Sequence, residues 1–103
     1  MAGLVLQFYL AGMGMFGASN WDAHRAVGYL LALLILVLLV LALIRRGPRR
    51  LLGMSALLAV LVIVQVVLPS LRTSVPFVAA LHPVNAMALL GVTATIMRSA
   101  RLP

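Results

Sequence analysis

A long apolar stretch opens with Asn20-Trp21-Asp22-Ala23-His24-Arg25-Ala26-Val27-Gly28 and runs to Ile44. From Ala26 onward it holds 19 residues without a charged or strongly polar side chain. A helix of that length crosses the hydrocarbon layer of a bilayer. The histidine therefore lies just inside one end of a predicted transmembrane helix.

Composition places the whole chain in a membrane. Of its 103 residues, 65% are hydrophobic and 9% are charged, and the mean hydropathy is +1.22. A soluble domain of this size could not cover so much apolar surface, so lipid is the expected solvent. The absence of cysteine excludes disulfides and thiolate metal sites, and the single acidic residue, Asp22, excludes a paired-carboxylate mechanism.

Four apolar segments predict an all-α, integral membrane four-helix bundle that forms a single domain over residues 1–103. The expected helices cover residues 2–18, 24–45, 51–69 and 77–98. The first segment is short and also resembles a cleaved signal peptide. Because no Lys or Arg precedes its apolar core, we predict a retained helix.

The basic residues indicate orientation rather than nucleic-acid binding. The net charge is +7, and all eight basic residues are arginines at the ends of apolar segments, where they contact lipid. Six lie in the Arg45–Arg50 turn and the C-terminal tail, whereas Arg25 and Arg72 lie at the opposite end. The positive-inside rule then puts both termini in the cytoplasm of a bacterial-type cell, with His24 and His82 near the outer face of its cytoplasmic membrane.

The two histidines occupy equivalent places in an internal repeat. His82 opens the last apolar segment in Leu81-His82-Pro83-Val84-Asn85-Ala86, as His24 opens the second. Gln7 and Gln65 each precede a histidine by 17 residues, and Gly28 and Ala86 each follow one by four. The sequence therefore predicts two pseudo-repeated helical hairpins, related by an axis along the membrane normal that brings the histidines face to face.

Two facing imidazoles suit one kind of metal centre. They are too few for a structural zinc site, which takes four ligands, or for a catalytic one, which takes three. Heme iron needs axial ligands only, because the porphyrin supplies the other four nitrogens. The small residues Gly28 and Ala86 lie on the histidine face one turn deeper and leave room for the macrocycle. We therefore predict that His24 and His82 bind one heme, of the b type, while an interfacial, half-hydrated His24 is the alternative.

Several polar and aromatic residues surround the predicted centre, each with two possible roles. Gln7 and Gln65 either hydrogen-bond across helices or orient the second nitrogen of a histidine. Arg25 and Arg72 bind either heme propionates or lipid phosphates. Trp21 belongs to an aromatic belt or covers the heme edge. Asn85 and Asp22 are further candidates for hydrogen bonds that orient the histidines.

The glycines of the first segment, Gly12, Gly14 and Gly17, make one end of that helix thin. Small residues at this spacing allow close helix–helix packing, and they also leave room for a flat macrocycle.

The histidine segments resemble those of the heme A synthases. Trp21-Asp22-Ala23-His24-Arg25-Ala26-Val27-Gly28 is similar to their His-Arg-x-x-Gly segment, and Leu68-Pro69 with Ala80-Leu81-His82-Pro83-Val84-Asn85-Ala86 is similar to the second histidine segment of one half. Those enzymes are eight-helix proteins built from two four-helix halves, each of which holds a heme through two histidines near the outer face. The resemblance implies a half-size relative. The chain is also similar to a small, functionally uncharacterised bacterial family of four-helix membrane proteins.

One departure bears on activity. The synthases carry a glutamate three residues before the first histidine, which is tied to oxidation of the heme methyl group, and Trp21 occupies that position here. The cysteine pair of many bacterial synthases is also missing. We therefore expect a b-type heme protein that acts in electron transfer or in redox or heme handling. The alternatives are a half-size heme-modifying enzyme working as a homodimer, and a heme-free accessory subunit of a larger membrane complex.

Overall fold

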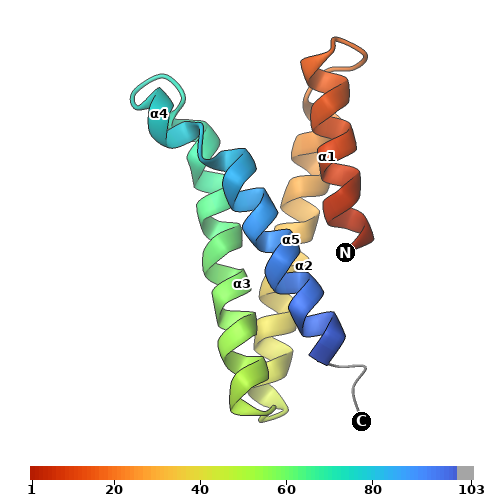
Figure 1. The fold of residues 1–103 in the computed structure, drawn as a ribbon, viewed down its shortest axis with the longest axis vertical. Coiled ribbons are helices and arrows are strands. Elements are labelled where there is room, and N and C mark those ends of the chain that lie inside the picture. The colour runs from red at the N-terminus through yellow and green to blue at the C-terminus, as the bar shows by residue number, and fades with distance from the viewer. Residues whose placement is uncertain (100–103) are drawn as a thin grey trace.

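The structure, a computed structural model, describes residues 1–99 and is all-helical over that range (Figure 1). Four helical segments follow one another along the chain, the last two of them made of two pieces each. The elements are α1 (Ala2–Met15), α2 (Asp22–Ile44), α3 (Arg49–Val67) continued by a 3-10 turn η1 (Leu68–Leu71), α4 (Pro76–Ala79) and α5 (His82–Ser99).

Three of the four segments are long and apolar enough to cross a membrane, namely Asp22–Ile44, Arg49–Leu71 and Pro76–Ser99. The first, α1, is an apolar helix of 14 residues. At 1.5 Å per residue it is about 21 Å long, which is less than the thickness of the hydrocarbon layer. Length and composition therefore support membrane localisation for α2, α3–η1 and α4–α5.

The helix bounds differ from the predicted ones where glycine and proline interrupt the chain. The first predicted helix, 2–18, ends at Met15, because the chain reverses at Gly17, whose φ is +72°, and Ala18 N–H bonds back to the Met13 carbonyl. This is the Schellman arrangement that glycine favours.

The fourth predicted helix, 77–98, is interrupted at Ala80 and Leu81, and α5 starts at His82. Pro83 is the second residue of α5. The N–H of a residue in the first turn has no partner within the helix, so proline removes no helical hydrogen bond there. The predicted helices 24–45 and 51–69 begin two residues earlier, at Asp22 and Arg49, and η1 extends the third segment to Leu71. Arg101, counted above with the tail arginines, lies outside the described residues.

The core is small and centres on α3. Leu58 and Val62 of α3 pack with Leu89 of α5 into a buried cluster, and α3 contacts both α2 and α5 while α1 packs on α2. Most other large apolar side chains face outward; Leu33 and Val60, each in mid-helix, are both 58% exposed. Apolar surface on this scale is typical of a protein that has lipid around it.

Candidate functional site

His24 and His82 lie at the same end of the bundle. His24 is in the first turn of α2 and His82 is the first residue of α5, and both helices start at the end opposite the α2–α3 turn (Figure 1). Their ring centroids are 6.2 Å apart and their planes make an angle of 70°. Both side chains are half-buried. The structure thus brings together the two histidines that the sequence singled out.

One nitrogen of each histidine is held by the main chain of the preceding helix. His24 Nδ1–H donates to the carbonyl oxygen of Gln7 over 3.2 Å, and His82 Nδ1–H donates to the carbonyl oxygen of Gln65 over 3.0 Å. Because a carbonyl oxygen only accepts, Nδ1 is the protonated nitrogen in both rings. Each Nε2 therefore keeps its lone pair, which is the state in which histidine binds a metal.

The side chains of the two glutamines make different contacts. Gln7 Nε2 donates to the His24 carbonyl over 3.0 Å and so ties α1 to α2. Gln65 Nε2 lies 3.2 Å from His82 Nε2 and donates to its lone pair. Both glutamine side chains thus bond across helices. The main-chain oxygens of the glutamines orient the imidazoles, a role that we predicted for their side chains.

Asn85 completes the amide contacts in one half only. Its Nδ2 donates to Gln65 Oε1 over 2.6 Å and to the Leu61 carbonyl over 2.8 Å. In the other half, Gln7 Oε1 is buried and has no hydrogen-bond partner within residues 1–99. Asn85 therefore positions Gln65 rather than contacting a histidine directly.

Gly28 serves the approach of Gln7. A Cβ atom at Gly28 would lie 3.2 Å from Gln7 Nε2, which is tighter than ordinary van der Waals contact. Its equivalent, Ala86, is half-buried on α5. The hydrogen bond between Gln7 and the His24 carbonyl thus requires a small residue at position 28, where we predicted one to make room for a macrocycle.

Trp21 lies against His24. The indole and imidazole centroids are 5.7 Å apart at 83°, an edge-on arrangement. A Cβ atom at Gly14 would come within 2.9 Å of the indole, so the thin face of α1 at that position accommodates Trp21. Gly12, by contrast, has open space beside it.

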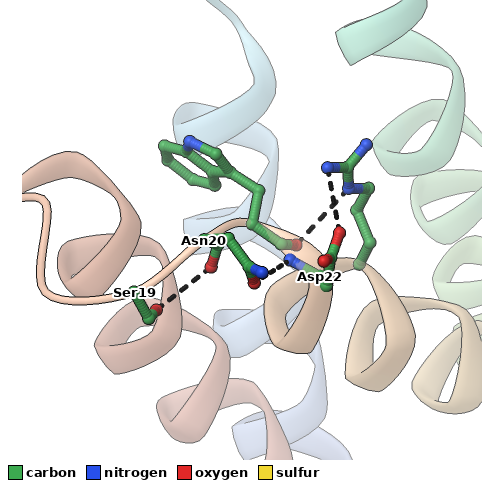
Figure 2. A network of polar contacts seen from close by, with 5 residues as sticks. Ser19, Asn20 and Asp22 are labelled. Atoms are coloured by element: carbon green, nitrogen blue, oxygen red, sulfur yellow. Dashed lines mark hydrogen bonds and ion pairs between the residues drawn. The ribbon is translucent and has the colours of Figure 1, made fainter.

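A chain of polar contacts holds the start of α2 (Figure 2). Ser19 Oγ donates to the Asn20 carbonyl, and Asp22 N–H donates to Asn20 Oδ1 over 3.0 Å. Arg25 lies 3.3 Å from Asp22, and both side chains are largely exposed. These contacts fix the turn that carries Trp21 and His24. Arg72 is exposed on the segment between η1 and α4.

The two histidines stand alone as candidate metal ligands. Within residues 1–99, no group of three or more His, Cys, Asp or Glu side chains gathers in one place. A zinc ion bound by three or four protein side chains therefore has no site in this part of the chain.

Comparison with known proteins gives one match. Residues 7–73 match the model of a family of unknown function, DUF6220. That range contains Gln7, His24 and Gln65 and ends before α4, so His82 lies beyond it. No curated protein and no solved structure matches the chain. The resemblance to the heme A synthases stays a prediction from the histidine segments.

Proposed function

The chain belongs to the DUF6220 family, whose function is unknown, and we propose from its own residues that it is a membrane b-type heme protein that carries single electrons. In this proposal, His24 and His82 are the residues that hold the heme iron. The observation behind this proposal is the pair of rings 6.2 Å apart, each with Nδ1 bonded to a main-chain oxygen.

The spacing of the rings suits a shared metal. An imidazole nitrogen binds a metal at about 2 Å, so a metal bound by two opposed imidazoles has ring centroids about 6 Å apart. Binding of one metal by two imidazoles would not require their planes to be parallel, so the observed angle of 70° does not conflict with the proposal. With Nδ1 of each ring occupied by a carbonyl, Nε2 is the nitrogen available for binding.

One contact has to change when the metal binds. Gln65 Nε2 now donates to His82 Nε2 and occupies its lone pair. Rotation of the glutamine amide frees that lone pair, while the main-chain bond from His82 Nδ1 to Gln65 remains. His82 thereby keeps its orientation during binding.

The ligand set favours electron transfer over catalysis on the heme. His24 and His82 would together hold the iron, and a bound heme would then supply one-electron redox chemistry without a free iron position for a substrate. The chain has no cysteine for covalent attachment, so the proposed heme is bound non-covalently, as a b-type heme is. Trp21, at the position of the synthase glutamate, has no carboxylate to assist an oxidation.

The proposed topology follows from the arginines. The Arg45–Arg50 turn faces the cytoplasm of a bacterial-type cell, and the histidine end lies beneath the outer leaflet. Its support is the separation of the two ends: four exposed arginines lie at the α2–α3 turn, and the histidines lie at the opposite end of the bundle (Figure 1). Electrons would then enter or leave the heme near the outer membrane surface.

The test is an absorption spectrum of protein purified in detergent from cells supplied with heme precursor. We expect one low-spin heme per chain. His24→Gly and His82→Gly should each lose the low-spin spectrum, because the chain contains no third histidine. Adding imidazole to either variant should restore it by supplying the missing ligand, which separates a lost ligand from a lost fold.

The matched control is Thr73→Ala, which removes an exposed polar side chain between η1 and α4, at the same end of the bundle. It should keep the full heme content and the wild-type spectrum. A colourless wild-type protein from heme-replete cells would refute heme binding. Wild-type spectra in both histidine variants would refute these ligands.

A further inference from the structure

The end of the bundle remote from the histidines contains an apolar cavity of about 360 Å³ between α2, α3 and α5. Its volume is within the range of small-molecule binding sites. A hollow of about 210 Å³ shares Met97 with it and is also lined by Arg98. The side chains around the larger cavity include Leu38, Ala42, Leu51, Ser55, Ile96 and Met97. Arg98 therefore lines the smaller hollow, which adjoins the apolar cavity at Met1 and Met97.

Positive charge is concentrated at this end. The exposed side chains of Arg45, Arg46, Arg49 and Arg50 form the α2–α3 turn, and Arg98 lies near the end of α5. The only acidic residue of the sequence, Asp22, lies at the other end of α2, where it contacts Arg25. No side-chain carboxylate in the sequence is therefore placed to pair with these arginines, which leaves their guanidinium groups available to an anion.

In the α2–α3 turn, an arginine occupies a position where glycine would have the lower conformational energy. Helices α1 and α2 end in the same way, with Ala18 N–H bonded to the Met13 carbonyl and Gly47 N–H bonded to the Ala42 carbonyl. The left-handed residue is Gly17 in the first case, with φ +72°, but Arg46 in the second, with φ +48°. A side chain in this conformation costs about 1 kcal/mol. That cost is consistent with a use for the Arg46 guanidinium group.

We propose that this end binds an anionic phospholipid of the surrounding bilayer. One acyl chain occupies the cavity, and the phosphate lies against Arg98 and the arginines of the α2–α3 turn. Arginine suits this role because its planar guanidinium group binds phosphate oxygens in pairs. Basic pockets between membrane helices bind anionic headgroups in this way. The proposal does not depend on heme binding.

The experiment measures lipid retained by the full chain in detergent, by native mass spectrometry, after titration with phosphatidylglycerol or with phosphatidylcholine of the same acyl chains. We expect phosphatidylglycerol to bind at least tenfold more tightly. The double substitution Arg49→Gln with Arg98→Gln should reduce that preference to less than threefold. Ala42→Phe, which fills the cavity and leaves every arginine in place, should weaken phosphatidylglycerol binding at least fivefold.

The matched control is Arg72→Gln, an exposed arginine at the histidine end, which should leave both affinities unchanged. If Ala42→Phe does not fold, Met97→Trp fills the same cavity from a more exposed position. Equal affinity for the two lipids would overturn the proposal, and so would an equal effect of Arg72→Gln. Unchanged phosphatidylglycerol binding in the cavity-filling variant would show that the lipid contacts the surface arginines without entering the cavity. That outcome also overturns the proposal.

Discussion

In the second hairpin, formed by α3 with α5, Asn85 donates to Gln65 Oε1, whereas the corresponding residue in the first hairpin is Val27. Both hairpins share the bond from histidine Nδ1 to the carbonyl oxygen of a glutamine 17 residues earlier. They differ in the amide oxygen of that glutamine, which has a donor in the second hairpin and none, within residues 1–99, in the first.

This difference shows that one set of contacts orients the imidazole and another holds the glutamine side chain. The main chain orients both rings alike, so neither hairpin needs a side chain for that purpose. Asn85 adds rigidity around His82 by holding Gln65 and the Leu61 carbonyl together. We infer that the His82 ring is held more firmly than the His24 ring, and that the rotation of the Gln65 amide that the proposed heme requires would also break its bond from Asn85.

The largest effect is expected from Gly28→Leu. A side chain at residue 28 collides with Gln7, whose Nε2 would lie 3.2 Å from the new Cβ, and overpacking of this kind costs about 1–3 kcal/mol. We expect loss of more than 90% of bound heme and a lower melting temperature in detergent. The matched change Ala86→Leu tests the other hairpin. Wild-type heme content in Gly28→Leu would contradict a tight contact between α1 and α2 here.

The next effect is expected from Asn85→Leu. It leaves Gln65 Oε1 without a donor and removes the second donor of the Leu61 carbonyl, and an unsatisfied buried polar group costs about 1–3 kcal/mol. Thermal unfolding monitored by circular dichroism should detect the loss. Val84→Leu, at the exposed neighbouring residue of α5, is the control. Equal melting temperatures for the two variants would show that the Asn85 contacts contribute nothing.

A smaller effect is expected from Arg25→Gln and Arg72→Gln. The contact between Arg25 and Asp22 joins two side chains that are 63% and 74% exposed, so its loss should change stability by less than about 1 kcal/mol. If these arginines bind heme propionates, each substitution should lower heme affinity about fivefold, the equivalent of about 1 kcal/mol. Heme titration of the apoprotein measures this, and unchanged affinity in both variants would show that these arginines do not bind heme propionates.

The smallest effect, and the only stabilising one, is expected from Val27→Asn. This change copies Asn85 into the first hairpin and gives Gln7 Oε1 a donor. Hydrogen bonds between membrane helices contribute about 0.6 kcal/mol on average, so the melting temperature should rise by a few degrees. Val27→Leu is the apolar control. A lower melting temperature in Val27→Asn than in Val27→Leu would show that the two hairpins are not equivalent at this residue.

The sequence was sufficient for the four helical segments and for the facing histidines, because apolar length and a repeated spacing carry that information. It did not reveal that main-chain oxygens hold the imidazoles, since every residue has such an oxygen and only the pairing of helices selects one. The constant spacing of 17 residues between glutamine and histidine was the available signal. The interruption at Ala80 and Leu81 was also missed, because apolar residues there continue the hydrophobic pattern.

The acceptor for each Nδ1 proton is a peptide oxygen, and that has a consequence for how the site tolerates change. Any amino acid at positions 7 and 65 brings the same oxygen, so point substitutions there leave the choice of free nitrogen intact. Inserting a single residue into α1 between Gln7 and Met15 has the opposite outcome. It turns one helix face by about 100° relative to the other and points the imidazole away from its acceptor, although every side chain of the site is still present.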